Sequence, residues 1–338
     1  MLAWTIYISF IGVLVLMFLP AGQAWLARRV ALLAASIGLG IAIFAVLDRK
    51  PDAGIQPIAQ YEWIPGLGIS YYLAADGISL TLVLLTGLAA VVGILFSWNI
   101  EHRAKEFFAF YLALIGGVYG VFLSFDLFLL FVFYELAIIP KYFLIAIWGS
   151  TNKEYGAMKL ALYSFVGSAM VLIGIVAAYV VSGAKSMSLL DMAHYEYPAS
   201  FQYWAFPLVF VGFAILAGMW PFHTWAPTGH VAAPTAASML LAGVVMKLGA
   251  YGALRVAMTL FPLGLAEWRN EIALLAVIGI VYGATVALVQ KDFKFVIGYS
   301  SVSHMGFVIL GLVTISSIGT VGLSGAVLQM FSHGIIAG

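Results

Sequence analysis

The chain alternates between long apolar stretches and short polar connections from one end to the other. A helix that crosses a bilayer needs about 20 consecutive, mostly apolar residues, and this pattern predicts about eleven such helices. They are expected at residues 3–20, 30–47, 77–99, 106–123, 127–149, 157–182, 204–224, 233–257, 272–289, 295–313 and 318–338. The sequence therefore predicts an all-α fold, a polytopic transmembrane helix bundle.

The connections between these stretches are short, apart from residues 48–76 and 183–203. Neither is long enough for a soluble domain, so we expect residues 1–338 to form a single transmembrane domain. The last apolar stretch runs to Gly338 with no polar tail after it. A natural chain rarely ends inside a membrane helix, so we expect a protein truncated at its C-terminus.

The first apolar stretch, Trp4 to Leu19, could be taken for a signal peptide. It lacks a basic n-region and a small-residue cleavage site, and we interpret it as a first transmembrane helix. Lysine and arginine are slightly more frequent in the loops that follow odd-numbered helices. Because cytoplasmic loops are enriched in these residues, the N-terminus is predicted to lie outside.

Composition points to the same class of protein. Apolar residues make up 64% of the chain and charged residues only 9%, with a mean hydropathy of +1.08, so a soluble domain could not cover itself with polar surface. The expected partner is the lipid bilayer, and a net charge of +1 does not suggest nucleic acid. The absence of cysteine excludes a disulfide, thiolate ligation of an iron–sulfur cluster and a cysteine-ligated zinc site within this chain.

Residues Trp220 to Pro234 interrupt the helical pattern with three prolines in fifteen residues. Proline removes a backbone donor and clashes with the preceding turn. Irregular backbone at membrane depth is tolerated where protein or a water-filled cavity satisfies it, and transporters often build ion sites from discontinuous helices. The stretch is either such a discontinuous helix or a proline-rich loop that joins two helices, and the pattern does not decide between them.

Two charged residues lie near the middle of predicted helices, Glu135 in the fifth and Lys247 in the eighth. A charge at the bilayer centre costs about 2.5–3.5 kcal/mol on insertion scales, and such residues usually face a protein interior and serve a function. The alternative is a buried structural ion pair. A second lysine, Lys141, follows Glu135 by six residues, so it points about 120° away and lies about 9 Å along the axis. It either faces another helix or extends to the cytoplasmic surface.

Four histidines lie in predicted membrane helices or in the proline-rich stretch between them. His304 sits among hydroxyl side chains at mid-depth, His333 lies in the last apolar stretch, and His223 and His230 lie in the proline-rich stretch. Imidazole titrates near neutral pH. Together with the buried charges, these histidines indicate a chain of protonatable sites, although each could simply be hydrogen-bonded. Which helices are neighbours cannot be deduced from the pattern.

Several motifs are more specific. They are Asp76-Gly-Ile-Ser-Leu80, Ser97-Trp-Asn-Ile100, the stretch from Val121 to Glu135, Tyr142 to Gly149, Trp220-Pro-Phe-His-Thr-Trp225, Ala233 to Ser238, Lys247-Leu-Gly-Ala-Tyr-Gly252 and Tyr299 to His304. With these motifs the chain resembles the M-type (chain 4) membrane subunit of proton-pumping NADH:quinone oxidoreductase, respiratory complex I. More broadly it is similar to the antiporter-like proteins of Mrp cation/proton antiporters.

This resemblance implies a fold of fourteen helices with two inverted five-helix repeats, of which this chain would lack about the last three. It implies that Glu135 is the fifth-helix glutamate and Lys247 the eighth-helix lysine of a proton pathway, with His223, His230, His304 and His333 as relays. It also implies that the chain carries no redox centre of its own. NADH, FMN, iron–sulfur clusters and quinone would be bound by partner subunits.

The resemblance further implies neighbouring antiporter-like subunits as partners and a bacterial inner membrane as the location. The chain departs from the family at Leu216, where a seventh-helix lysine is usual, and over Ala226 to His230. Lys141 is a candidate to replace that lysine in proton translocation. An Mrp-type antiporter subunit and a structural scaffold that has lost pumping are the alternative functions.

Overall fold

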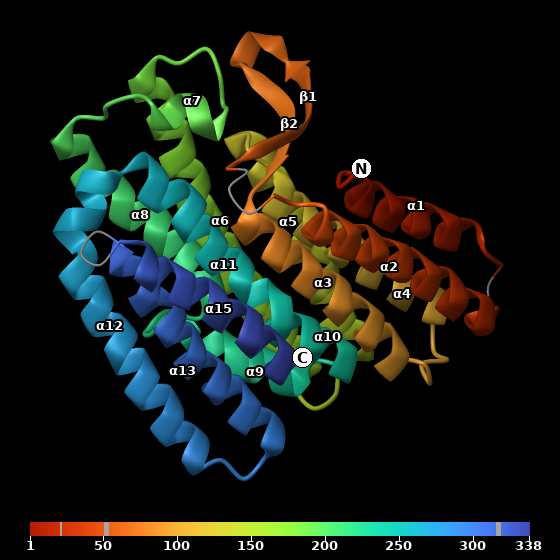
Figure 1. Cartoon of the computed structure of the whole chain (residues 1–338). Helices are drawn as coiled ribbons and strands as arrows, with labels where there is room; N and C mark the ends of the chain where they lie inside the picture. The colour runs from red at the N-terminus through yellow and green to blue at the C-terminus, as the bar shows by residue number, and fades with distance from the viewer. Residues whose placement is uncertain (21, 51–53, 316–318) are drawn as a thin grey trace.

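The computed structural model describes residues 1–20, 22–50, 54–315 and 319–338 as a bundle of long helices (Figure 1). Ten helices in this part of the chain are long and apolar enough to cross a membrane, and a shorter apolar helix, α1, precedes them. The prediction of about eleven membrane helices is therefore confirmed. The predicted stretch 318–338 begins at Ile318, which lies outside the described residues, and its helix is described from Thr320.

The first half of the bundle consists of seven longer helices and one short one. They are α1 (Trp4–Phe18), α2 (Ala24–Leu47), α3 (Gly77–Phe96), α4 (Ala104–Leu123), α5 (Leu127–Trp148), α6 (Lys153–Ser182), α7 (Leu189–Ala193) and α8 (Ala199–Ala217). The second half has more interruptions. Its elements are η2 (Phe222–Thr224), α9 (Trp225–Ala232), α10 (Thr235–Leu240), η3 (Leu241–Val245), α11 (Met246–Gly252), η4 (Ala253–Met258), α12 (Pro262–Leu288), α13 (Phe293–Val313) and α15 (Thr320–Ala337).

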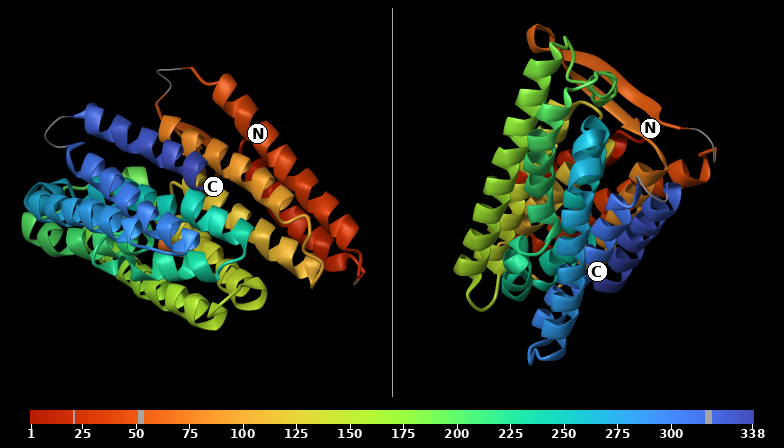
Figure 2. Two further views of the ribbon diagram at one scale, coloured as in Figure 1. Left: turned by 90° about the horizontal axis from the view of Figure 1, so that it is seen from below. Right: turned by 90° about the vertical axis from the view of Figure 1, so that its left-hand side faces the viewer.

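The spans differ greatly in how deeply they are buried. In the most apolar part of each span, 94% is buried for Thr235 to Met258 and 78% for α4. The long helices α6 and α12 lie on the outside of the bundle (Figure 2), with 39% and 22% buried. The helix that carries Lys247 is therefore the centre around which the others pack.

The proline-rich stretch contains both of the structures that the sequence allowed. Helix α8 stops at Gly218, which adopts a left-handed backbone with φ of 77°, and the chain resumes as the 3₁₀ turn η2 and helix α9. The indole of Trp225 donates over 2.7 Å to the Ile215 carbonyl, which also accepts from the Gly218 amide over 3.1 Å, so α9 is bonded to the end of α8 across the break. The loop between spans is short, with extended residues Ala233 and Pro234.

The span that follows is helical throughout but not uniformly α-helical. Two π-helical segments, η3 and η4, flank the α-helical turn that holds Lys247. A π segment widens the helix and shifts its backbone hydrogen bonds, and such segments are frequent at functional sites. The apolar pattern of residues 233–257 predicts a membrane helix there but contains no signal for these wider turns.

The predicted all-α fold is confirmed, but the long polar connection before α3 contains a structure that the sequence did not predict. Strands β1 (Gln56–Ile64) and β2 (Ile69–Ala75) form an antiparallel hairpin, joined by the 3₁₀ turn η1 (Pro65–Leu67). The hairpin stands at the same end of the bundle as α7 (Figure 1), where the Met187 amide donates to the Gly68 carbonyl over 2.8 Å. Beta structure is possible here because the segment lies beyond the ends of the spans, where water can solvate strand edges.

Two carboxylates fix the helices at this end. Asp126 caps α5 by accepting from the amides of Phe128 and Leu129, each at 3.0 Å, and it also accepts from the hairpin amide of Ser70 at 2.9 Å. Asp76 caps α3 and pairs with Arg255. Burial alone would raise the pKa of Asp76, but the charge of Arg255 and the Ser79 amide lower it further, so the pKa lies below its usual value.

Helix boundaries differ from the sequence prediction mainly where polar residues extend a helix beyond its apolar part. Helix α12 begins at Pro262 rather than near residue 272, because its first turns carry Glu267, Arg269 and Glu271. Helix α2 likewise begins at Ala24 and includes Arg28 and Arg29. An apolar window finds the membrane-spanning part of a helix but not the polar turns that continue it.

The close packing of α8 on α11 gives a test of the fold. A Cβ atom added at Gly249 would lie 2.4 Å from the Ala217 amide nitrogen and 2.5 Å from the Phe213 carbonyl oxygen, so Gly249→Ala would force the helices apart. We expect a loss of about 1–3 kcal/mol, typical of overpacking, seen as a lower thermal midpoint in detergent. Gly325→Ala on α15 is the control, since a Cβ there meets nothing within 4 Å. Equal midpoints for the two variants would contradict this packing.

Candidate functional site

Lys247 is completely buried, yet its ammonium has two polar partners. It donates to the carbonyl oxygen of Ala242, a residue of the π segment η3, and it lies 2.6 Å from Nδ1 of His333 on α15. The first partner is five residues earlier in the same span, so the irregular helix itself supplies an acceptor for the charge. This combination allows an ammonium to stay at membrane depth without reaching water.

A row of hydrogen bonds leads away from Lys247. Nε2 of His333 lies 3.1 Å from the hydroxyl of Ser301 on α13. The ring of His333 stacks on that of His304, with centroids 5.1 Å apart, and Nδ1 of His304 is 2.8 Å from the amide nitrogen of Gln329. The structure therefore brings together Lys247, His333 and His304, which the sequence could only identify one by one.

His230 lies beside this row without joining it directly. Its side chain is fully buried, Nδ1 lies 3.1 Å from the Ser238 hydroxyl, and Nε2 has no hydrogen-bond partner among the described residues. Because Ser238 belongs to the same membrane span as Lys247, this hydrogen bond joins His230 to the span that carries the row.

His223 belongs to a different polar cluster. It is 3% exposed, its ring lies 5.1 Å from that of Tyr282 and 6.4 Å from that of Tyr299, and neither ring nitrogen makes a hydrogen bond of good geometry within the described residues. The cation that acts on it is Lys159 of α6, whose ammonium lies 3.4 Å from the Thr228 hydroxyl. The structure thus separates His223 from the Lys247 row.

Glu135 and Lys141 form a third group on α5. Lys141 is 1% exposed, so its ammonium does not extend to the cytoplasmic surface, and no described residue accepts a hydrogen bond from it. One carboxylate oxygen of Glu135 is likewise buried without a partner. No salt bridge among the described residues joins Glu135 to Lys247. Leu216, at the end of α8, is buried and apolar, so that position holds no cation.

Sequence reasoning did not single out Ser301, Ser238 and Gln329 as partners of the histidines. A signal was present for Gln329, because it precedes His333 by four residues and therefore shares its helix face. Ser301 lies three residues before His304 in the hydroxyl-rich motif, but it bonds to a histidine 32 residues away. Such a contact follows from helix packing and not from local spacing.

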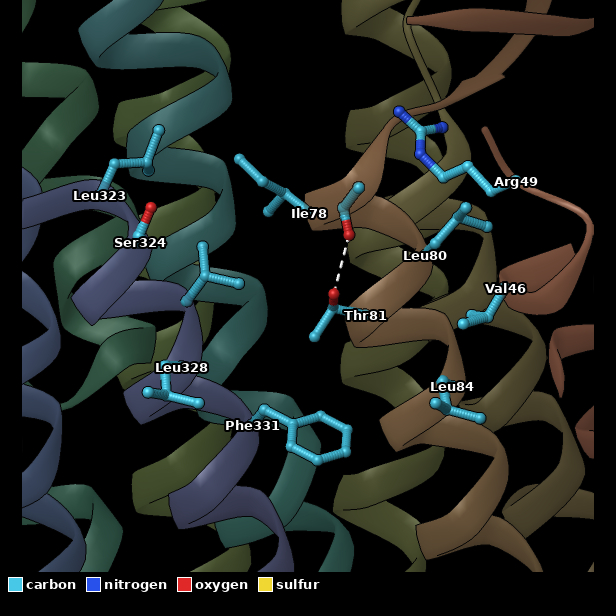
Figure 3. Close-up of a pocket in the computed structure, with 12 residues that line it drawn as sticks. Val46, Arg49, Ile78, Leu80, Thr81, Leu84, Leu323, Ser324, Leu328 and Phe331 are labelled. Carbon is cyan, nitrogen blue, oxygen red and sulfur yellow. Dashed lines mark hydrogen bonds between the residues drawn. The ribbon is translucent and has the colours of Figure 1, made fainter. Parts of the chain in front are cut away.

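A cavity of about 670 Å³ lies elsewhere, between α3 and α15 (Figure 3). Its walls are mostly apolar side chains such as Leu84, Leu328 and Phe331, and Arg49 stands at its rim. The hydroxyl of Thr81 within it is already bonded to the Gly77 carbonyl over 2.8 Å. None of the predicted site residues lines it, and it presents no chain of titratable groups.

Chemically, the Lys247 row can pass a proton. When Lys247 donates to Nδ1 of His333, Nε2 carries the proton that faces Ser301, so one ring links an ammonium and a hydroxyl. No group of three or more His, Cys, Asp or Glu side chains in the described ranges could hold a metal ion. The fold and the buried row of bases and hydroxyls together define a polytopic helical membrane protein with titratable groups at membrane depth.

Comparison with known proteins gives the particular family. The transmembrane family described as NADH:quinone oxidoreductase/Mrp antiporter matches residues 124–338, and the chain belongs to that family. It is 37% identical over 324 residues to NADH-quinone oxidoreductase subunit M of Rhodobacter capsulatus, an alignment that covers 92% of this chain and 62% of the relative. It is also 37% identical over 330 residues to NAD(P)H-quinone oxidoreductase chain 4 of a Picosynechococcus species, covering 97% of this chain and 60% of the relative.

Solved structures agree on the fold. A chain of respiratory complex I from Thermus thermophilus superposes with a TM-score of 0.85 at 25% identity, over 99% of this chain and 71% of that chain. A chain of the Mrp complex from a Dietzia species superposes with a TM-score of 0.84 over 99% of this chain and 62% of that one. At 20% identity, the second match shows the fold alone. These neighbours belong to multi-subunit membrane complexes.

The hydrogen-bond row gives a test at Ser301. We expect Ser301→Ala to slow proton movement across vesicles about fivefold, because a lost hydrogen bond of ~1 kcal/mol corresponds to that factor. Ser303→Ala is the matched control, since the Ser303 hydroxyl donates to the Ile280 carbonyl over 2.9 Å and is not among the hydrogen-bond partners of His304 or His333 in the described residues. Proton movement measured by a pH-sensitive dye should distinguish the two variants. Equal rates would mean that Ser301 is not part of the path.

Proposed function

We propose that this protein is a proton-translocating membrane subunit of an NADH:quinone oxidoreductase. The observation that carries the proposal is the row from Lys247 through His333 to Ser301, buried at membrane depth in a chain that belongs to this family. A lysine held among uncharged bases and hydroxyls is a site that can gain and lose a proton as its surroundings change. The whole chain, residues 1–338, acts as one antiporter-like domain.

In this proposal the redox chemistry belongs to partner subunits. Electrons pass there from NADH through FMN and iron–sulfur clusters to quinone, and this chain contributes no redox centre. Conformational or electrostatic coupling to those subunits alternates the proton affinity and access of Lys247. The partners include neighbouring antiporter-like subunits, and the complex lies in a bacterial inner membrane.

The histidines, Glu135 and Lys141 act at separate points of the proton path in this proposal. His333 and His304 extend the path from Lys247 towards α13, and His230 is bonded to the span that carries Lys247. Glu135 and Lys141 act at a separate point on α5, and His223 at another with Lys159. Because these groups do not touch, water must complete the path between them.

The first test is Glu135→Gln. A carboxylate within a membrane span is unfavourable unless it is paired or used, so we expect an assembled variant with proton pumping reduced roughly 10²-fold, the contribution typical of a positioned proton-transfer group. Pumping and quinone reductase rates should be measured on the same vesicles. Near-normal pumping by an assembled variant would rule out this role.

The second test separates a proton carrier from a fixed charge at Lys247. Arginine stays protonated at any working pH, so Lys247→Arg should fail almost as badly as Lys247→Ala if Lys247 titrates during turnover. We expect both to lose roughly 10²-fold in pumping, measured with the same dye assay. Wild-type pumping with arginine would show that a permanent positive charge is sufficient.

An Mrp-type antiporter subunit is the function that this proposal must be distinguished from. Both kinds of complex contain this fold. In membranes that contain the protein, proton pumping that depends on NADH and quinone supports the proposal. Cation/proton exchange that an ion gradient drives without NADH would support the antiporter instead.

A further inference from the structure

The side chain of Lys141 is the least satisfied charge in the described part of the bundle. It is 1% exposed, and its ammonium has no hydrogen-bond partner there. By contrast, Lys247 has a carbonyl and an imidazole, and Arg255 has Asp76. An ammonium without partners inside a membrane protein is strongly unfavourable, so Lys141 requires a counter-charge or water.

Glu135 is the group that meets this requirement. Glu135 and Lys141 are the two charged side chains of α5, six residues apart on the same helix. The Oε1 atom of Glu135 is itself buried without a partner, although the side chain as a whole is partly exposed. The two groups are more than 4.0 Å apart, since no salt bridge joins them. The Lys141 ammonium and Oε1 of Glu135 are thus two buried groups of opposite charge on one helix that both lack a hydrogen-bond partner among the described residues.

The backbone between them is also unusual. Pro140 lies inside α5 between the two residues and has no amide hydrogen, so the carbonyl of Leu136, four residues earlier, loses its helical donor. The proline thus removes one helical donor between the carboxylate and the ammonium. A carboxylate, a carbonyl that lacks this donor and an ammonium are partners that one or two water molecules can bridge.

The partly buried charged side chains on the helices beside α5 already have partners of their own. Leu216 and Phe213 of α8 are buried and apolar, and Tyr134, which stacks edge-on against Phe213, has a buried hydroxyl without a partner. Glu106 of α4 lines a pocket with Leu136, Ile139 and Pro140, and its Oε1 lies 3.7 Å from Nε of Arg103. Lys153 of α6 donates to the Ile147 carbonyl near the end of α5 over 2.9 Å. The other lysine of α6, Lys159, is engaged with Thr228.

We propose that Lys141 and Glu135 form a water-bridged ion pair within α5, and that Lys141 is a positioning residue that keeps Glu135 ionised until a proton arrives. That Glu135 then passes the proton onward rests on the function proposed above, whereas the pairing itself does not. Because both residues lie on one helix, their spacing is fixed by the helix and does not change when helices move against each other. Glu135 would therefore keep its charge through conformational changes that would separate a pair formed across two helices.

The test uses dicyclohexylcarbodiimide, an apolar reagent that reacts with protonated carboxyl groups. It can approach α5 through its outer face, where Leu136 and Ile139 are 39% and 47% exposed. The protein is labelled at pH 7 in the complex in which it is expressed, and mass spectrometry quantifies the peptide that contains Glu135. Wild-type protein should label slowly. Lys141→Met and Lys141→Gln should label at least about tenfold faster, since one pKa unit changes the protonated fraction of an ionised acid tenfold.

Two controls make the result specific. Lys141→Arg keeps the positive charge and should label as slowly as wild type, and Lys159→Met removes a lysine from the adjacent helix and should also change nothing. Labelling of both neutral variants at the wild-type rate would overturn the pairing, as would rapid labelling of the arginine variant. The pairing stands without the proposed function if labelling follows the expectation while Glu135→Gln pumps normally.

Discussion

A buried ammonium that cannot reach water determines how the second half of this protein is built. Lys247 has no exposure, so every partner must come from the protein. One is the Ala242 carbonyl of a π segment, and the other is His333 of a helix 86 residues further along the chain. The wide turns, the close approach of α15 and the near-complete burial of the span from Thr235 to Met258 are all consistent with this requirement.

The sequence was sufficient to predict the membrane helices and the place where one of them is interrupted. The bilayer sets the length of an apolar helix, so the eleven helices could be counted, and three prolines within fifteen residues marked the interrupted region. The hairpin was missed because short strands outside the membrane leave no long apolar run. The π segments were missed because this span is apolar on nearly all sides, so an extra residue that rotates the helix face leaves no visible change in the pattern.

For the site, titratable residues within apolar stretches were enough to identify Lys247, His333 and His304. They did not show that these three residues are in contact. Their contacts join α11, α13 and α15, and which helices pack together depends on the whole bundle. The position of Glu135 could not be predicted for the same reason. The sequence left open an ion pair between Glu135 and Lys247. In the structure Glu135 lies instead on a helix with its own cation, Lys141, whose burial depended on which way α5 faces.

The uneven burial of the spans has a consequence for biogenesis. The span from Thr235 to Met258 carries Lys247 and Arg255, so as a lone helix it would enter lipid with two uncompensated cations. The central one, Lys247, is unfavourable by about 2.5–3.5 kcal/mol. The counter-ion of Arg255, Asp76, is synthesised 179 residues earlier, whereas His333 emerges only 86 residues after Lys247. When this span is synthesised, Arg255 therefore already has its counter-ion, whereas Lys247 does not yet have His333. The span must stay beside the earlier helices at the insertion machinery until α15 arrives, whereas α12, with 22% of its residues buried and no cation in its apolar part, can enter lipid on its own.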